Sequence, residues 1–371
     1  MAGKLVITTG SSRCGRKELF LPGFEKYCAE NGTKVKIYNV GDMIFPWAWY
    51  NIREELNRDT ILDVNPLAVD IIHAAVLRDI HSSLKKDLEE NDAVLINLHT
   101  IFIWRDVWNR VFNELFIREL IEDGLSPDMF ICFIDLAEDI LKRLNETDQW
   151  RGQKLTEDNI WSWENEEANN TKALTYLFDE KKKFFVMPAK QPPETLYYLL
   201  FEPQRPVVYA QMPITHVTAQ DLKRVKQFIE KLRKWAVVFD PLTIETGPVE
   251  RAEGDNEQIR VRHNQTAYRD VGWFIPQSDV CIAYYVKVVF SAGVVDETAT
   301  ASQLGKQTWV VFPKDYSPFI HFRATPNRIF QMPEEVLEFA EKEFIPWWTK
   351  KWQEKYGEKT VSKEAIINTT T

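Results

Sequence analysis

Residues 4–18 read KLVITTGSSRCGRKE, and this stretch decides the fold class. Its apolar start predicts a buried strand over residues 4–8 that stops at Gly10. Apolar residues then recur at helical spacing from Lys17 to Asn31, and a second β-rich run covers residues 35–40. A strand, a glycine-bounded loop, a helix and another strand are typical of the opening of a parallel α/β sheet.

The alternation continues through the first half of the chain and predicts one α/β domain over residues 1–190. The further elements expected there are strands at 93–98, 129–134 and 184–187 and helices at 70–91, 107–123, 137–145 and 172–183. A polar stretch with three tryptophans, residues 146–170, precedes the last of these helices.

Two proline clusters predict the domain boundary. Gln191-Pro192-Pro193 and Pro203-Gln204-Arg205-Pro206 limit regular structure, so a linker is expected at 191–205. The pattern then restarts as a second α/β domain, 206–330, followed by a C-terminal helix and tail, 331–371. The elements expected after the linker are strands at 207–210, 236–239, 280–285 and 308–312 and helices at 219–234, 264–277, 295–304 and 334–356. The fold class is therefore α/β, with two open parallel-sheet, Rossmann-like domains.

The composition narrows the classes of partner. The 371 residues include 46 Lys plus Arg against 55 Asp plus Glu, a net charge of −9. An acidic chain without a dense basic tract disfavours a nucleic-acid polymer and favours a small ligand. No window approaches the ~20 apolar residues of a membrane span, and the apolar run after Met1 is too short for a secretory leader, so a cytoplasmic protein without membrane contact is expected. The four dispersed cysteines lack metal-ligand spacing, and no metal site is expected.

The first candidate site is the loop between Gly10 and Gly15. The Gly-x-x-x-x-Gly spacing between a strand and a helix suits a phosphate, because loop N–H groups and the helix N-terminus can bind it. Arg13, Arg16 and Lys17 could hold the same phosphate. However, Arg16 occupies the position of the usual lysine, and Lys17 that of the hydroxyl that ligates magnesium.

With this loop, residues 4–185 resemble the archaeal-type adenylate kinase group of nucleoside monophosphate kinases. Asn97-Leu98-His99 stands where the family has an Asp-Thr-His triplet, and Arg143 and Arg151 resemble its lid arginines. Phosphoryl transfer depends on positioning and on neutralisation by lysine, arginine and magnesium. The missing lysine, hydroxyl and aspartate imply a degenerate domain that binds a nucleotide, ATP or AMP, or organises the assembly. An active kinase stays as an alternative.

The second candidate site lies in the C-terminal half, at predicted strand ends and helix starts. A predicted strand ends near Tyr209, just before a turn, and Asp270 lies in a predicted helix. Ser291 and Gly293 open another helix, which carries Glu297 one turn later. The helix start can bind an anion, and two carboxylates in one pocket divide into an ionised group and a proton donor. Such a pair suits displacement of a base from an anomeric carbon.

These pieces, over residues 206–320, resemble the nucleoside 2-deoxyribosyltransferase superfamily, which includes deoxynucleoside monophosphate N-glycosidases. The resemblance implies that Glu297 is the nucleophile, Asp270 the second carboxylate and Tyr209 their neighbour. Ser291 in place of the aspartate of the transferases implies a 5′-phosphate, with Ser317 as a further phosphate contact. The family's glycine-rich turn after Tyr209 is replaced by Met212-Pro213-Ile214-Thr215, and the charge of Asp296 is added.

The leading hypothesis is an N-ribosyl hydrolase that cleaves a nucleoside or deoxynucleoside 5′-monophosphate without a required cofactor. Base exchange between deoxynucleosides, a non-catalytic nucleotide sensor and a nucleotide kinase are the alternatives. The resemblance also implies a homodimer or a higher homo-oligomer.

Overall fold

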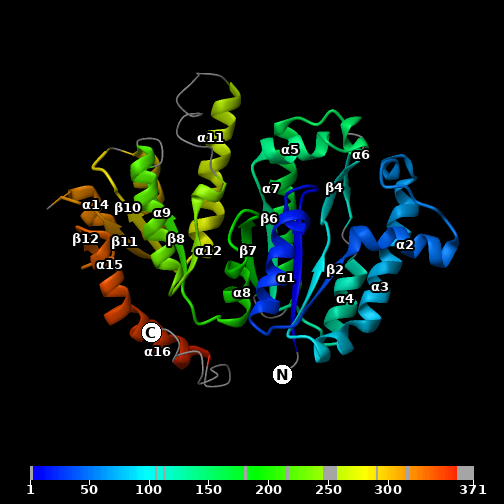
Figure 1. Cartoon of the computed structure of the whole chain (residues 1–371), viewed down its shortest axis with the longest axis horizontal. Helices are drawn as coiled ribbons and strands as arrows, with labels where there is room; N and C mark the ends of the chain where they lie inside the picture. The colour runs from blue at the N-terminus through cyan, green and yellow to red at the C-terminus, as the bar shows by residue number, and fades with distance from the viewer. Residues whose placement is uncertain are drawn as a thin grey trace. The chain divides into compact units, whose positions relative to one another are not determined.

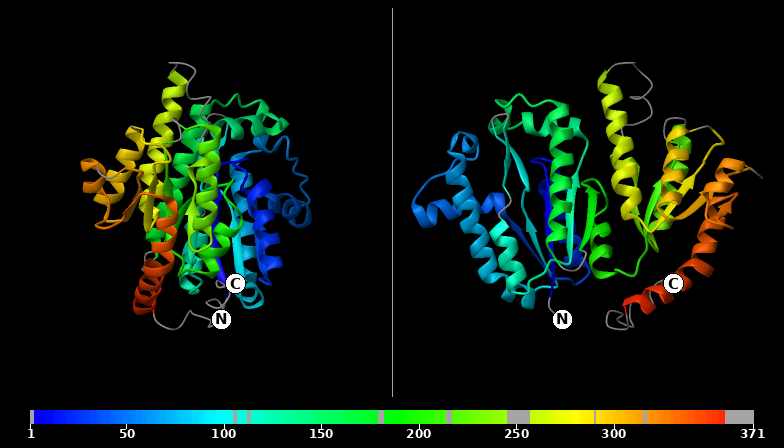
Figure 2. Two further views of the ribbon diagram at one scale, coloured as in Figure 1. Left: turned by 60° about the vertical axis from the view of Figure 1, so that its left-hand side comes forward. Right: turned by 180° about the vertical axis from the view of Figure 1, so that it is seen from behind.

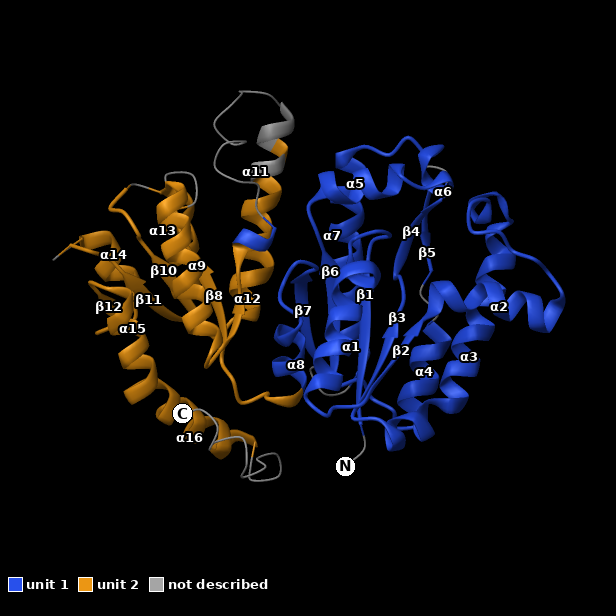
Figure 3. Cartoon of the chain, viewed as in Figure 1, with its two compact units in different colours: residues 1–200, 242–245 blue, residues 201–241, 246–371 orange. Residues whose placement is uncertain are grey.

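A computed structural model describes residues 3–104, 107–111, 114–178, 182–213, 217–244, 257–289, 291–314 and 317–356 (Figure 1, with further views in Figure 2). The chain divides into two compact units (Figure 3). Unit 1 comprises residues 1–200 and 242–245, and unit 2 comprises residues 201–241 and 246–371. No helix among the described residues is long and apolar enough to cross a membrane.

Unit 1 is built on five parallel strands in the order β2-β3-β1-β6-β7. The strands of unit 1 are β1 (Lys4–Gly10), β2 (Val35–Asn39), β3 (Ala93–Asn97), β6 (Met129–Ile134) and β7 (Lys183–Pro188), with a separate antiparallel hairpin of β4 (Ile101–Trp104) and β5 (Val107–Arg110). The helices are η1 (Arg16–Phe20), α1 (Leu21–Glu30), α2 (Val40–Ile52), η2 (Ile61–Asp63), α3 (Pro66–Glu90), α4 (Glu114–Glu122), α5 (Ala137–Asn145), α6 (Asp148–Arg151), α7 (Glu157–Leu174), η3 (Thr175–Leu177) and α8 (Glu194–Phe201).

The central strand of unit 1 is β1, the first strand of the chain. Val6 pairs in register with Leu95 of β3 and Met129 of β6, and every residue of β1 after Lys4 is buried. Helices α1 and α8 cover one face of the sheet, and α3, α4 and α7 cover the other (Figure 1, Figure 2). A strand buried on both faces reads as a continuous apolar run, which is why this part of the fold is visible in the sequence.

Unit 2 also has five parallel strands, in the order β12-β11-β10-β8-β9. Numbered within the unit, this is the 2-1-3-4-5 order of a doubly wound sheet. The strands are β8 (Val207–Gln211), β9 (Val237–Phe239), β10 (Val280–Tyr284), β11 (Gln307–Val311) and β12 (Ile329–Phe330). The helices are α9 (Ala219–Arg233), η5 (Pro241–Thr243, which straddles the unit boundary), α11 (Glu257–Arg269), η6 (Asp270–Phe274), α12 (Ile275–Gln277), α13 (Ala292–Gln303), α14 (Pro318–Arg323), α15 (Pro333–Phe339), η7 (Ala340–Phe344) and α16 (Ile345–Tyr356).

The two open parallel sheets expected from the sequence are thus confirmed, while several element assignments are wrong. The expected helix at 107–123 is the strand β5 followed by the shorter helix α4. The polar stretch at 146–170 contains most of α7, which begins after a capping box between Thr156 and Asn159. The expected linker at 191–205 contains α8, because the prolines flank an eight-residue apolar segment rather than interrupt it.

Candidate functional site

The loop after β1 lies where unit 1 can bind a ligand. The chain leaves β1 towards β2 on one side of the sheet and leaves β6 towards β7 on the other, so the carboxyl ends of β1 and β6 form a switch point. Gly10, Arg13 and Gly15 have positive φ angles of 148°, 60° and 88°. The φ of Gly15 favours glycine, and a Cβ there would lie 2.8 Å from Nη1 of Arg143, so that side chain would have to shift.

A buried carboxylate from α7 fixes the base of this loop. Glu167 Oε1 accepts hydrogen bonds from the backbone amides of Gly10 and Thr100, over 3.1 and 2.8 Å, and Oε2 accepts one from Ile101 over 3.0 Å. Burial raises the pKa of Glu167 to about 7, although these hydrogen bonds and the nearby Arg16 act to lower it. Glu164, one turn earlier, accepts the amide of Asp135 after β6 over 2.8 Å. Helix α7 therefore connects the ends of β1, β3 and β6.

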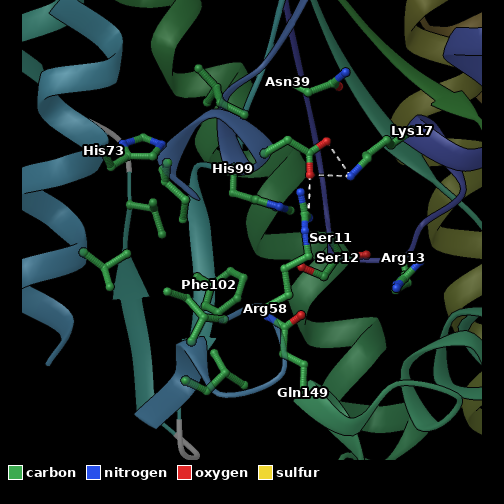
Figure 4. Close-up of a pocket in the computed structure, with 18 of the residues that line it drawn as sticks. Ser11, Ser12, Arg13, Lys17, Asn39, Arg58, His73, His99, Phe102 and Gln149 are labelled. Atoms are coloured by element: carbon green, nitrogen blue, oxygen red, sulfur yellow. Dashed lines mark hydrogen bonds and ion pairs between the residues drawn. The ribbon is translucent and has the colours of Figure 1, made fainter. Parts of the chain in front are cut away.

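A cavity of about 250 Å³ opens beside the loop, at the carboxyl ends of β1, β2 and β3 (Figure 4). Its polar lining comes from the loop, the strand ends, helices α2, α3 and α6 and the segment after α2: Ser11, Ser12, Arg13, Arg16, Lys17, Glu18, Asn39, Asp42, Arg58, Asp70, His73, Asn97, His99, Asn109 and Gln149. Its apolar lining includes Ile44, Phe45, Phe102, Trp104 and Trp150. A few convergent polar groups on an apolar wall are typical of a small-molecule site.

Four cations line this cavity, and each has a protein partner. Lys17 Nζ lies 2.6 Å from Oδ1 of Asp42, and Nη1 of Arg58 lies 2.7 Å from the same oxygen. Arg13 pairs with Glu18 over 3.0 Å. Arg16 is 5% exposed and donates from Nη1 to the carbonyl of Leu98 over 2.9 Å. The predicted phosphate-loop cations therefore lie together, with Arg58 as a fourth that the sequence pattern missed.

Two histidines on the cavity wall are neutral at pH 7. Burial lowers the pKa of His73 to about 4. Burial, helped by the positive charge of Arg16, lowers the pKa of His99 to about 3. The cationic lining therefore consists of lysine and arginine alone.

The other kinase-like positions have structural partners. Arg143 forms an ion pair with the buried Asp135, to which Lys190 also pairs over 3.1 Å. Arg151 pairs with Asp148 at the surface over 2.7 Å. Neither Arg143 nor Arg151 lines the cavity. Asn97, at the position of the family's aspartate, donates to Asn39 over 2.7 Å and accepts from Thr8 over 3.3 Å. Of the two lid-like arginines, Arg143 lies beside the loop, at Gly15, and Arg151 does not line the cavity.

In unit 2, the switch point lies between β8 and β10, the first and third strands of the 2-1-3-4-5 order. Helix α13 contributes to this edge: the hydroxyl of Thr298 donates to Oε1 of Gln211, the last residue of β8, over 3.3 Å. Glu297, the preceding residue, is half-buried. Burial and the charge of Glu297 raise the pKa of Tyr285, which follows β10, to about 12. Glu297 therefore lies near the carboxyl ends of β8 and β10, where the sequence pattern predicted it.

The helix that carries Glu297 begins at Ser291, which is 9% exposed and caps it by accepting from the amide of Val294 over 3.5 Å. A Cβ on Gly293 would lie 3.8 Å from Oε1 of Glu297, so this carboxylate folds back towards the first turn of its own helix. Ser291, Gly293 and Glu297 thus share one helix end, as the sequence predicted.

Asp270 lies on η6, which packs against this helix, and Tyr209 lies on β8, which contacts η6. Asp270 is 3% exposed and begins η6, against which α13 packs. Tyr209, 1% exposed in the middle of β8, stacks on Phe274 at the other end of η6, with ring centroids 5.8 Å apart. Asp270 therefore lies on an element next to the helix that carries Glu297.

Ser317 precedes α14, and its backbone amide donates to Nδ1 of His321 over 3.2 Å. Helix α14 packs against α13, so Ser317 lies on an element next to the one that begins at Ser291.

Several residues of both sites were missed by the sequence pattern. Asp42 and Arg58 come from a region to which no element was assigned, Glu167 from a stretch that looked solvated, and Gln211 from the end of a strand. Only Gln211 had a local signal, because a polar residue at a parallel-strand end marks the ligand edge. Among the described residues, no group of three or more His, Cys, Asp or Glu is arranged to hold a metal ion.

No protein-family model matches the chain, and no curated protein matches it. Among solved structures, a GTPase from Pyrococcus abyssi in its apo form is similar at 15% identity, with a TM-score of 0.29; the match covers 54% of this chain and 98% of that chain. This likeness carries no argument about function. It also does not bear on the resemblance of unit 2 to nucleoside 2-deoxyribosyltransferases, which stays a prediction. The structure itself shows an α/β chain with two five-stranded parallel sheets, each with polar side chains at its carboxyl edge.

Proposed function

We propose that unit 2 hydrolyses the N-glycosidic bond of a nucleoside or deoxynucleoside 5′-monophosphate. One observation carries the proposal: Glu297 lies at the β8/β10 switch point, on a helix whose first turn is capped by the buried Ser291. Ligands of open α/β sheets bind at such points, and the amide groups of a helix start favour an anion.

The chemistry needs two carboxyl groups. The Glu297 carboxylate attacks C1′ of the sugar, and the electron pair of the C1′–N bond leaves with the base, which takes a proton from Asp270. Water then attacks C1′, gives its proton to Asp270 and releases the sugar phosphate from Glu297. Asp270 is assigned as the acid because it is buried on η6, which packs against the helix that carries Glu297. Tyr209 is the tyrosine proposed to lie near the nucleophile, and Tyr285 lies close enough to Glu297 for its charge to raise the pKa of the tyrosine.

The experiment is an assay of the purified chain for released base with a panel of ribo- and deoxyribonucleoside monophosphates. Glu297→Gln should reduce base release by at least a thousandfold. The matched control is Asp296→Asn, which makes the same change at the exposed neighbouring residue and should keep the activity within threefold. No base from any substrate with the wild-type chain would contradict the proposal. A new nucleoside formed when a second free base is added would instead favour base exchange.

We also propose that unit 1 binds a nucleotide. The specific observation is the cavity that combines the glycine-bounded loop, four cations and an apolar wall. Thermal shifts with AMP or ATP, without turnover, would support a binding domain. Magnesium-dependent ATP turnover that is lost in Arg16→Met would instead favour kinase activity. A homo-oligomer is part of the proposal for unit 2, and light scattering of the full chain would test it.

A further inference from the structure

The cavity of unit 1 has one point at which two cations from separate segments converge. Lys17 comes from η1 behind the loop, and Arg58 comes from the segment between α2 and η2 (Figure 4). Both reach the carboxylate of Asp42: Lys17 Nζ lies 2.6 and 2.5 Å from its two oxygens, and Arg58 Nη1 lies 2.7 Å from Oδ1. A lysine and an arginine on a single anionic group are the arrangement that binds a phosphate.

The arginine is held in place by a second contact. Its guanidinium lies over the ring of Phe45, 4.4 Å from the centroid, and this cation–π contact fixes its plane towards the cavity. Asp42 itself lies in the first turn of α2, where a negative charge is favoured. Burial acts to raise the pKa of Asp42, but hydrogen bonds from Lys17 and Arg58 outweigh it and hold this pKa below its usual range. The carboxylate is therefore ionised and occupies the point of convergence.

The surrounding polar groups also suit an anion. The N-terminus of α2 opens on the cavity through Asn39 and Gly41, and the side chain of Asn39 makes no cap hydrogen bond there. Ser11 lines the same cavity, is 1% exposed, and its hydroxyl has no hydrogen-bond partner among the described residues. Nε of Arg16 is equally buried and without a partner in that part of the chain. Buried polar atoms without partners are uncommon, and these two are available to a ligand group that enters the cavity.

The opposite wall suits a flat apolar group. Phe102 packs between Trp104 and Trp150, with ring centroids 6.3 and 5.1 Å away, and Ile44 completes the wall. The volume of about 250 Å³ is at the small end for ligand sites and fits a compact ligand with a single phosphate.

We propose that Lys17 and Arg58 form a phosphate clamp that Asp42 occupies in the absence of ligand. A phosphate monoester with a flat apolar group, such as a nucleoside monophosphate, then binds by displacing the Asp42 carboxylate. The inference rests on the nucleotide binding proposed for unit 1, and it adds that the chain inhibits its own site with an internal carboxylate.

The test is calorimetric titration of the full-length chain with AMP and with adenosine. Asp42→Asn removes the competing charge and should tighten AMP binding at least tenfold, while the affinity for adenosine stays within twofold. Lys17→Met in the Asp42→Asn background should remove the gain. The control for net charge is Glu90→Gln, which breaks an exposed ion pair with Lys86 on the same unit and should leave AMP binding as in the wild type.

Three results would overturn the inference, and they differ in whether nucleotide binding by unit 1 survives. AMP binding to the wild-type chain that is unchanged or weaker in Asp42→Asn would remove the displacement of Asp42 and leave nucleotide binding intact. No AMP binding by the wild type or by either variant would remove both. An equal gain for adenosine would show that Asp42 restricts access to the cavity rather than competing with a phosphate, which also overturns the inference.

Discussion

The backbone amide of Gly10 donates a hydrogen bond of 3.1 Å to the carboxylate of Glu167, which lies 157 residues further along the chain. The bond joins the end of the central strand to a helix on one face of the sheet. The same carboxylate accepts the amides of Thr100 and Ile101 after β3. The loop that borders the cavity therefore starts from a backbone position that a distant side chain fixes.

Glu167→Gln should destabilise unit 1. An amide offers one acceptor oxygen instead of two and directs its NH₂ group at a backbone donor, so at least one buried amide loses its partner. Each such loss costs about 1–3 kcal/mol, and we expect the free energy of unfolding to fall by about 3 kcal/mol in urea titrations. Glu166→Gln changes the exposed neighbour and should stay within about 0.5 kcal/mol of the wild type. Equal effects of the two substitutions would contradict the stabilising role of these hydrogen bonds to Glu167.

His73 should make the stability depend on pH in a defined window. Burial lowers its folded-state pKa to about 4, from about 6.5 in an unfolded chain. The unfolded chain then binds the proton more readily, so the contribution is present above pH 6.5 and is lost as the pH falls towards 4. The difference in unfolding free energy between the wild type and His73→Gln should be constant above pH 7 and change by about 3 kcal/mol down to pH 4. The raised pKa of Glu167 acts oppositely, but it is common to both proteins and cancels. A difference that is independent of pH would contradict this prediction.

Gly15→Ala should strain the phosphate loop. Its φ of 88° is unfavourable for alanine, and the new methyl group would lie 2.8 Å from Arg143 and 3.0 Å from Leu19. We expect a loss of about 1–3 kcal/mol in stability and weaker AMP binding. Gly152→Ala is the matched control, because its φ is −73° and nothing lies within 4 Å of the added carbon. If both variants unfold alike, the loop is not constrained as described.

Ser291 offers a way to separate helix capping from phosphate binding. Ser291→Ala should cost about 1 kcal/mol by removing the cap. Ser291→Asp keeps a capping oxygen and the stability, but its charge should repel a 5′-phosphate. On the proposed function, its KM should rise at least tenfold for nucleoside monophosphates and stay within threefold for the matching nucleosides. Equal changes for both substrate classes would argue against a phosphate at this helix start.

The sequence was sufficient to locate the strands and helices whose hydrophobic pattern follows directly from their burial. The fully buried strands β3, β6 and β10 and the amphipathic helix α5 lie where the periodicity predicted them, and α5 has the predicted bounds of 137–145. In parallel sheets such elements face the core on simple periods, so local sequence and global fold agree.

The α7 helix shows why other parts could not be predicted. Its core-facing positions include Glu164 and Glu167, both fully buried, which interrupt the apolar stripe and make the segment look solvated. Their burial depends on backbone amides of β1, β3 and β6 that no local window contains. Helix α2, which carries Asp42, was missed because Pro46 lies inside it and proline usually ends a helix. These residues of the candidate site of unit 1 thus lie where local rules and tertiary contacts disagree.

The position of β1 in its sheet has a consequence for biosynthesis. The central strand β1 is synthesised well before its partners, β3 and β6: Lys4 pairs with Ala93, and Val6 with Met129. Until the chain has been synthesised through Asn97 both edges of this apolar strand are unpaired, and one edge stays unpaired until Ile134, so the strand is exposed to aggregation. The nascent chain should therefore be a client for chaperones that bind short apolar segments, well before either ligand edge exists.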